Sequence, residues 1–252
     1  MRLAGKSAII TGATSGMGKA MAERFAIEGA ALILSGRDLE KGKELEKTIS
    51  ATGARVKFVA GDVGTLEVNQ LLVKTAIEYF GKLDFVVTNA GILGLGSVTE
   101  ISLEDWNNTI NTNLNSVFYL SRFAIPEMQK QGGGTILVNS SIAAFKSFPN
   151  HAAYCATKAA LVALVKEMAV DYGPSIRVNT ICPGPVDTPM IWDSAKAFES
   201  PETIVQQTAD NTLMKRLGKP ADIASLALFL VSDEASWITG SASTIDGGIL
   251  VK

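Results

Sequence analysis

Tyr154 and Lys158 are the side chains whose types and spacing best suit proton transfer. They lie near the start of a predicted helix over 152–172, and a spacing of four residues places the phenol and the ammonium on one helix face. An unperturbed tyrosine has a pKa of about 10, so bringing it towards neutrality requires about 4 kcal/mol of differential interaction. A close lysine cation contributes to that shift, which makes Tyr154 a candidate acid or base. Such pairs also arise by chance, so the interpretation depends on the residues around them.

Ser141 and Asn113 are the polar residues that would complete such a site. Ser141 follows a predicted strand over 135–139, where its hydroxyl can hold a substrate carbonyl against the phenol. The plain alternative is that Ser140-Ser141 only ends the strand. Asn113 lies in a long predicted helix over 103–130, where an amide lowers helix stability. It therefore either caps a break in the helix or serves a buried water or proton path.

A glycine-rich segment over 11–18 follows the first predicted strand and leads into a helix. Its glycines allow a sharp turn and a close approach to a pyrophosphate, whose charge the helix N-terminus favours. The spacing Gly-x-x-x-Gly-x-Gly departs from the commonest dinucleotide motif, and a plain turn between strand and helix is the alternative. The segment 89–91, after the fourth predicted strand, would bring a second backbone turn to the same ligand.

Short runs rich in Val and Ile alternate along the chain with longer segments of helical periodicity. This alternation predicts a parallel, doubly wound α/β sheet whose strands are buried on both faces. The predicted strands are Ser7–Thr11, Ala31–Ser35, Val56–Ala60, Phe85–Thr88, Thr135–Asn139, Arg177–Ile181 and Ser243–Ile245. The predicted helices are Gly16–Glu28, Leu39–Ala51, Thr65–Phe80, Leu103–Lys130, Ala152–Tyr172 and Pro220–Ser232. Ligands of such sheets bind beyond the carboxyl ends of the strands, and a proline-rich segment at about 184–218 would cover them.

Composition excludes several classes of function. The 252 residues are 47% hydrophobic and 19% charged with a net charge of −2, which indicates a globular chain and argues against nucleic-acid or membrane partners. Two cysteines and one histidine argue against a disulfide framework or a metal site, and favour a cytoplasmic location. The length favours one domain over 1–252.

Taken together, these segments resemble the compact branch of the short-chain dehydrogenase/reductase family over essentially the whole chain. The matching residues are those at 11–18, 62–63, 89–91, Asn113, Ser141, Tyr154, Lys158, 183–184, Thr188 and 246–248. The resemblance implies a seven-stranded Rossmann sheet in the order 3-2-1-4-5-6-7, and hydride transfer between NAD(P) and a carbonyl or alcohol. Thr88 stands where the family usually has a second asparagine before 89–91, which affects no catalytic position.

The resemblance also implies a role for each residue of a catalytic tetrad. Tyr154 would exchange a proton with the substrate oxygen, and Ser141 would position that oxygen. Lys158 would bind the nicotinamide ribose and lower the tyrosine pKa, while Asn113 would maintain a water relay to the lysine. The implied cofactor-binding residues are Gly12, Thr14, Ser15, Gly16, Met17, Gly18, Ser35, Arg37, Asp62, Val63, Asn89, Ala90, Gly91, Tyr154, Lys158, Pro183, Gly184, Val186 and Thr188.

The end of the second strand favours NADP(H) over NAD(H). NAD enzymes commonly place an acid at the position of Gly36 to bind the ribose 2′-hydroxyl. Here Arg37 follows a glycine, and its guanidinium suits a 2′-phosphate, with Ser35 as a further hydrogen-bonding group. The alternative is that Arg37 pairs with Asp38 or stacks on adenine.

The substrate is the least determined feature of the sequence. Aromatic and apolar residues in the segments that border the cleft favour an apolar ketone or alcohol, although each could equally pack the covering loop. The candidate substrate-binding residues are Ser141, Phe148, His151, Tyr154, Met190 and Trp192, with His151 interpreted more readily as an incidental loop residue. A 3-oxoacyl-thioester reductase is the alternative enzyme.

A non-catalytic dinucleotide-binding sensor or scaffold is the alternative from another class, and retention of all four tetrad residues argues against it. The family also implies a homotetramer, and 114–130 and 161–172 carry apolar residues for its interfaces. Stereoselectivity and reaction direction have no signal in the sequence.

Overall fold

The computed structural model describes residues 1–196 and 198–252, and a parallel sheet of seven strands forms its centre. The sheet order is β3-β2-β1-β4-β5-β6-β7, which confirms the predicted fold and order. The strands are β1 (Ser7–Thr11), β2 (Ala31–Gly36), β3 (Val56–Ala60), β4 (Phe85–Thr88), β5 (Gly134–Asn139), β6 (Ile176–Pro183) and β7 (Ala242–Ile245). Each neighbouring pair is parallel, so the carboxyl ends of the strands meet at one edge.

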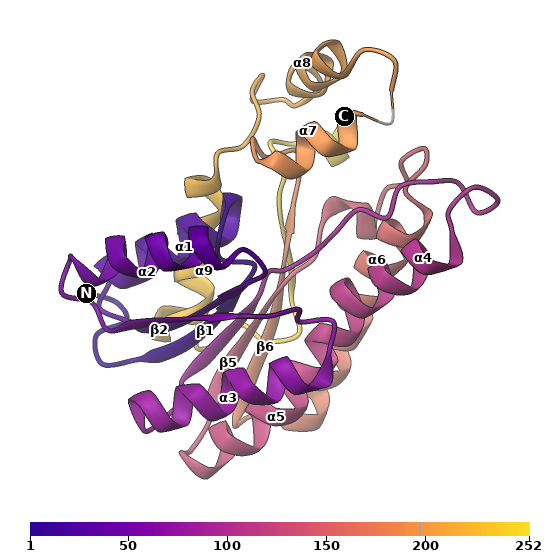
Figure 1. Cartoon of the computed structure of the whole chain (residues 1–252). Coiled ribbons are helices and arrows are strands. Elements are labelled where there is room, and N and C mark those ends of the chain that lie inside the picture. Colours follow the sequence, from indigo (N-terminus) through magenta and orange to yellow (C-terminus); the bar gives the residue numbers. More distant parts are fainter. Residues whose placement is uncertain (197) are drawn as a thin grey trace.

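Helices cover both faces of the sheet and make two hydrophobic layers (Figure 1). The helices α1 (Gly16–Ile27), α2 (Leu39–Ser50) and α9 (Pro220–Val231) lie on one face. The helices α3 (Leu66–Phe80), α5 (Ser116–Lys130) and α6 (Ala152–Tyr172) lie on the other. Every residue of β1 and β4 is buried, as expected for central strands covered on both sides.

The predicted helix over 103–130 contains an irregular turn that the sequence interpretation left open. It consists of α4 (Leu103–Ile110), a π-helical turn (Asn111–Asn115) and α5. Asn113 lies in this turn, and its buried side chain accepts a hydrogen bond from the Ile92 amide at 2.8 Å. A π-helical turn re-aims side chains within a helix and is frequent at functional sites. Here it directs the Asn113 amide towards the carboxyl edge of the sheet.

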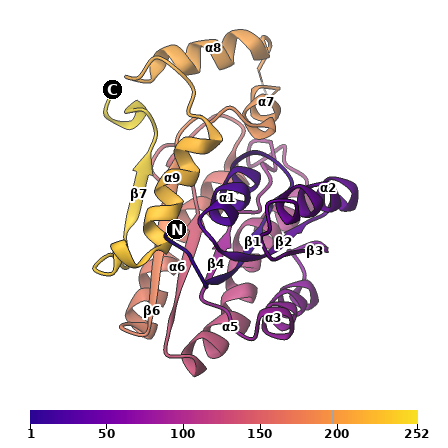
Figure 2. The ribbon, with the colours of Figure 1, turned by 90° about the vertical axis from the view of Figure 1, so that its left-hand side faces the viewer.

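Two short helices form the segment predicted to cover the ligand. Figure 2 shows α7 (Pro189–Ala195) and α8 (Pro201–Asn211) above the sheet, on the same side as the C-terminus. Residue 197 belongs to the predicted covering segment and lies outside the described residues. Across residues 1–196 and 198–252, the structure contains no helix that is long and apolar enough to span a membrane.

Candidate active site

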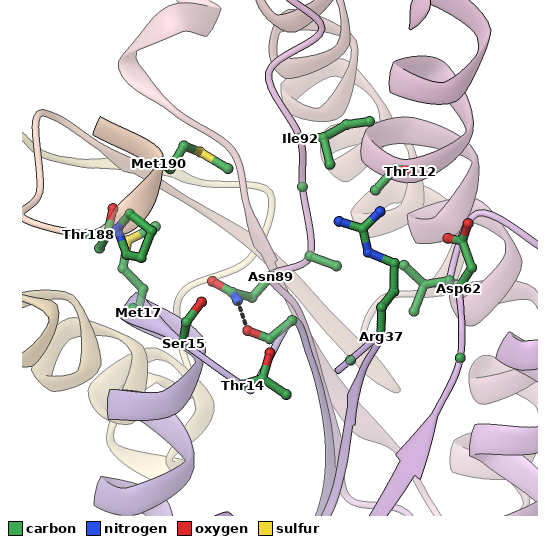
Figure 3. A pocket seen from close by; sticks show the side chains of 18 residues that line it. Thr14, Ser15, Met17, Arg37, Asp62, Asn89, Ile92, Thr112, Thr188 and Met190 are labelled. Atoms are coloured by element: carbon green, nitrogen blue, oxygen red, sulfur yellow. Dashed lines mark hydrogen bonds between the residues drawn. The ribbon is translucent and has the colours of Figure 1, made fainter. Parts of the chain in front are cut away.

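A cavity of about 200 Å³ opens at the carboxyl ends of β1, β2 and β4 (Figure 3). The glycine-rich turn forms one wall, Arg37 and Asp62 lie at another side, and Gly91 and Thr188 complete the lining. Its lining residues are Gly12, Thr14, Ser15, Gly16, Met17, Gly36, Arg37, Gly61, Asp62, Val63, Asn89, Ala90, Gly91, Ile92, Thr112, Thr188, Pro189 and Met190. The structure thus brings most of the predicted cofactor residues together around one space.

Two glycines explain why this turn accepts no larger residue. Gly12 has φ of +63°, and a Cβ there would lie 2.8 Å from Cα of Ala90. A Cβ at Gly18 would collide with the Gly12 carbonyl oxygen, so α1 can approach the turn this closely only with glycine. The first turn of α1 carries no acidic residue, and the Ser15 side chain makes no capping bond. Its amides and dipole suit a diphosphate, so the cavity fits a dinucleotide.

Asn89 ties the glycine-rich turn to the centre of the sheet. Its Nδ2 donates to the carbonyl oxygens of Thr11 at 3.1 Å and Gly12 at 3.0 Å. Its Oδ1 accepts a hydrogen bond from Nδ2 of Asn139 at 2.8 Å, at the end of β5. The sequence analysis did not identify Asn139, because only the paired strands place it beside Asn89.

Arg37 reaches into the cavity from the end of β2, on the side of Asp62 (Figure 3). Its neighbour Asp38 caps α2 by accepting from the Lys41 amide at 3.0 Å and also pairs with Nζ of Lys41 at 3.1 Å. These bonds lower the pKa of Asp38, the Lys41 backbone bond contributing most. The predicted alternative, a pair between Arg37 and Asp38, is therefore not what the structure shows.

Tyr154 and Ser141 lie on the wall of a second cavity, of about 190 Å³, beneath α7 and α8. Ser141 follows β5, and its Oγ accepts a hydrogen bond from the Ala143 amide at 3.1 Å. Tyr154 lies in the first turn of α6, with its hydroxyl 3.9 Å from Sδ of Met190. The residues Met17, Thr188 and Met190 line both cavities, so the two spaces adjoin, and the shared Met190 is the residue that contacts the Tyr154 hydroxyl.

Lys158 and Asn113 lie behind these hydroxyls. Nζ of the buried Lys158 donates to the Asn139 carbonyl oxygen at 2.9 Å and lies 5.5 Å from the centre of the Tyr154 ring. Nδ2 of Asn113 donates to the Ile92 carbonyl oxygen at 2.9 Å. A Cβ built on Gly91 would lie 3.4 Å from Oδ1 of Asn113 and 3.7 Å from Nζ of Lys158. The absence of a side chain at Gly91 therefore leaves a space between the amide and the ammonium.

The pKa values at this site follow from burial. Burial raises the pKa of Tyr154, and the neighbouring Ser141 hydroxyl opposes that rise. Burial also lowers the pKa of Lys158 to about 8 and raises that of the Cys182 thiol to about 11. The sequence analysis predicted that Lys158 lowers the tyrosine pKa, and within the protein alone the shift is in the opposite direction. The main reason is the burial of the phenol, which lies in a mainly apolar cavity.

The second cavity is mainly apolar, with aromatic and aliphatic side chains from the covering helices. Three of the candidate substrate residues, Phe148, His151 and Met190, line it. Leu93 and Ser194 line it as well, although no pattern in the sequence indicated them. The buried His151 is therefore part of the cavity wall, although its incidental placement in a loop was preferred from sequence. Trp192 does not line the cavity: its indole is 41% exposed and donates to Asp187 at 3.1 Å. Helical geometry turns Trp192 outward, while its neighbours Met190 and Ile191 face inward.

Several predicted cofactor residues occupy other places. Pro183, Gly184 and Val186 line the apolar cavity rather than the nucleotide cavity. Ser35 is fully buried, and the nucleotide cavity does not include it among its lining residues. Ser35 lies inside β2 and is covered by the helical layers, whereas Gly36 is the last residue of the strand and Arg37 follows it.

Comparisons with known proteins agree with this geometry. A family model described as enoyl-(acyl carrier protein) reductase matches residues 12–250. Dehydrogenase/reductase SDR family member 4 of Homo sapiens is 34% identical, covering 98% of this chain and 88% of that protein. A 7α-hydroxysteroid dehydrogenase, solved with NADH and 7-oxo glycochenodeoxycholic acid, is 39% identical with a TM-score of 0.91 over 98% of this chain and 95% of that one. A variant of actinorhodin polyketide ketoreductase, solved with NADPH, is 28% identical with a TM-score of 0.92 over 97% of each chain.

Proposed function

The chain belongs to the short-chain dehydrogenase/reductase family of oxidoreductases, and from this premise we propose that it interconverts a ketone and a secondary alcohol with NADP(H), using Tyr154 as the acid/base. One observation carries the proposal. Ser141 and Tyr154 line an apolar cavity that shares Met17, Thr188 and Met190 with a cavity suited to a dinucleotide, and the Tyr154 hydroxyl contacts the shared Met190.

The two hydroxyls have different roles towards the substrate oxygen. Ser141 donates a hydrogen bond to the carbonyl oxygen and holds it beside the phenol. Tyr154 gives its proton to that oxygen during reduction and takes it back during oxidation. When bound in the nucleotide cavity, a nicotinamide cofactor would supply a hydride to the carbonyl carbon, or accept one from the carbinol carbon in the reverse direction. The apolar wall around Tyr154 excludes water, so the phenol serves as the proton donor in reduction.

Lys158 and Asn113 do not line the apolar cavity, and we assign them roles towards the tyrosine and the cofactor. With its pKa lowered to about 8, Lys158 lies closer to the operating pH than an exposed lysine does. It binds the nicotinamide ribose and, with the positive charge of the oxidised cofactor, favours the phenolate form. The space beside Gly91, bounded by the Asn113 amide and the Lys158 ammonium, suits a water molecule that returns the proton to solvent.

The preference for NADP(H) is supported by the groups around Arg37. Its guanidinium reaches into the nucleotide cavity, and Asp38 is engaged by Lys41. Gly36 provides no carboxylate to bind a 2′-hydroxyl or to repel a 2′-phosphate. Relatives of known structure use either nucleotide, as the NADH and NADPH complexes show, so the choice for this chain rests on its own residues.

A reductase of 3-oxoacyl thioesters is a second candidate. The description of the matching family model and the similarity to a polyketide ketoreductase favour it. Lys130 is the lysine that the segment 127–131 offers to an acidic carrier protein, and it is paired with Glu127 at 2.7 Å. A carrier-linked substrate therefore has little support from this surface.

Oxidation of NADPH in the presence of carbonyl compounds tests the proposal. The panel consists of cyclic ketones, diketones, hydroxysteroid-derived ketones and 3-oxoacyl thioesters. We expect turnover with alicyclic ketones and formation of one alcohol for each NADPH consumed. Turnover restricted to thioesters would favour the second candidate. Cofactor binding without turnover of any compound would favour the non-catalytic sensor and contradict the proposal.

A further inference from the structure

His151 and Ser194 form a polar pair on the wall of the otherwise apolar cavity. His151 precedes α6 and is 4% exposed, while Ser194 belongs to the covering helix α7. Nε2 of His151 lies 2.9 Å from Oγ of Ser194, and Nδ1 lies 2.6 Å from the carbonyl oxygen of Pro149. Both side chains line the cavity. The pair therefore places hydrogen-bonding groups where hydrophobic side chains would otherwise stand.

The Pro149 contact fixes which atoms carry protons. A carbonyl oxygen only accepts hydrogen bonds, so Nδ1 of His151 carries the proton. In the neutral ring Nε2 then has a free lone pair and accepts a hydrogen bond from the Ser194 hydroxyl. The proton of Ser194 is thus directed at the imidazole. The lone pairs of Oγ that remain can accept a hydrogen bond from a molecule in the cavity.

His151, which orients this acceptor, lies beside Tyr154. The His151 ring packs edge-on against the Tyr154 ring, with 6.2 Å between the ring centres. Phe148 also packs edge-on against the imidazole, with 6.1 Å between the centres. Tyr154 and Ser194 line the same cavity, so one substrate molecule could present an oxygen to Tyr154 and a second group to Ser194.

We propose that Ser194 binds a second hydroxyl group of the substrate as a hydrogen-bond acceptor, and that His151 is the positioning residue that sets this polarity. The substrate class is then an alicyclic hydroxyketone, or the corresponding diol in the oxidative direction. This inference rests on the proposed ketone–alcohol chemistry. It adds that the substrate carries a hydrogen-bond donor on an otherwise apolar ring system.

Matched ketones that differ by one hydroxyl test the inference. The probes are cyclohexanone with its 3- and 4-hydroxy derivatives, and a bicyclic decalone with its hydroxydecalone isomers. We expect wild-type kcat/KM to favour at least one hydroxyketone over its parent ketone by about three- to tenfold, the range of a neutral hydrogen bond. Ser194→Ala should bring that ratio close to one.

Two further variants show whether the preference for the hydroxyketone comes from the His151–Ser194 pair or from a disturbance of the covering helices α7 and α8. His151→Phe should reduce the same ratio, and the double variant with Ser194→Ala should reduce it no further, because the two residues act as one unit. Thr208→Val is the matched control, since this cavity hydroxyl donates to the Ile204 carbonyl oxygen within α8. It should leave the ratio unchanged.

The outcomes also distinguish the inference from the proposed function. Ketone turnover with a wild-type ratio of one or less for every isomer overturns the inference alone. The same holds for a preference that survives Ser194→Ala, or that Thr208→Val removes equally. Failure to reduce any ketone contradicts the proposed function itself.

Discussion

Lys158 is a buried cation with a backbone carbonyl as its polar partner in the structure, and this position lowers the stability of the fold. Burial lowers its pKa from 10.5 to about 8, a difference equivalent to about 3 kcal/mol. Below pH 8 the folded protein must carry the buried charge. Between pH 8 and 10.5 the unfolded chain binds more protons than the folded one, so this group makes stability rise with pH.

Lys158→Met should therefore be more stable than the wild type at pH 7. The expected gain in the free energy of unfolding is about 2 kcal/mol. Removing the buried charge removes a cost of about 3 kcal/mol, and losing the hydrogen bond to Asn139 subtracts about 1 kcal/mol from that gain. The gain should fade as the pH rises from 8 to about 10. Urea unfolding of both proteins across that range measures it. A variant less stable than the wild type at pH 7 would contradict the burial penalty.

The choice of cofactor should depend on Arg37. Arg37→Ala removes a charge-assisted hydrogen bond worth about 1.5–3 kcal/mol, so NADPH should bind about ten- to a hundredfold more weakly. NADH lacks the 2′-phosphate, and its Kd should stay within threefold. Titration of cofactor fluorescence gives both constants. Equal losses for the two cofactors would show that Arg37 contacts the adenine rather than the phosphate.

A switch of cofactor preference from NADPH to NADH should require a change at Thr14 as well as at Gly36. A Cβ at Gly36 would lie 2.8 Å from Cγ2 of Thr14, so a new side chain has to displace the threonine. Gly36→Asp alone should weaken both cofactors, whereas Gly36→Asp with Thr14→Ala should favour NADH. Gly36→Ala adds a side chain without a carboxylate, so its effect on cofactor binding measures the steric contribution of the Gly36→Asp change.

The site was predictable from sequence at the residues whose chemistry is local. The spacing between Tyr154 and Lys158, and the place of Ser141 after a strand, indicated the catalytic hydroxyls. The contact between Thr14 and Gly36, and that between His151 and Ser194, join segments far apart in the chain. No spacing rule reports them.

At the scale of elements, three segments meet around Gly91. The loop after β4, the π-helical turn and α6 bring Asn113 and Lys158 to either side of it. Strands and most helices were predicted to within one or two residues, because apolar runs and helical periodicity are local signals. A break in the helix at Asn113 was only one of two possibilities left open, because the hydrogen bonds of Asn113 to Ile92 join segments that are distant in the sequence.

Gly91→Ala tests whether the space between these elements serves catalysis. The added methyl group would make ordinary contacts at 3.4 and 3.7 Å, so the free energy of unfolding should change by less than about 1 kcal/mol. We expect kcat to fall at least tenfold because the methyl group displaces the proposed water. Unfolding, NADPH binding and single-turnover rates are measured on the same protein. An unchanged kcat would contradict the water relay.

At the scale of the whole molecule, the exposed large apolar side chains include some on the elements expected to form interfaces between subunits. Phe118 on α5 is 48% exposed and Val170 on α6 is 78% exposed. Trp237, which precedes the edge strand β7, is 99% exposed. Exposed apolar side chains on α5, on α6 and beside β7 are consistent with the expected tetramer, in which two kinds of two-fold interface would cover them.

Sedimentation velocity tests this assembly. The wild type should sediment as a tetramer at micromolar concentration, and Phe118→Glu or Trp237→Glu should each leave a dimer. A wild-type monomer would contradict the assembly without affecting the proposed chemistry.

The central claim is that Tyr154 transfers the proton during carbonyl reduction, and Tyr154→Phe tests it most directly. The change removes one hydroxyl from the cavity wall and leaves the nucleotide cavity intact. The measurement is the single-turnover rate of NADPH oxidation with the best ketone, together with the Kd of NADPH for the same variant. The rate should fall about a thousandfold or more while the Kd stays within threefold. A variant that binds NADPH normally and keeps a tenth of the wild-type rate would contradict the account.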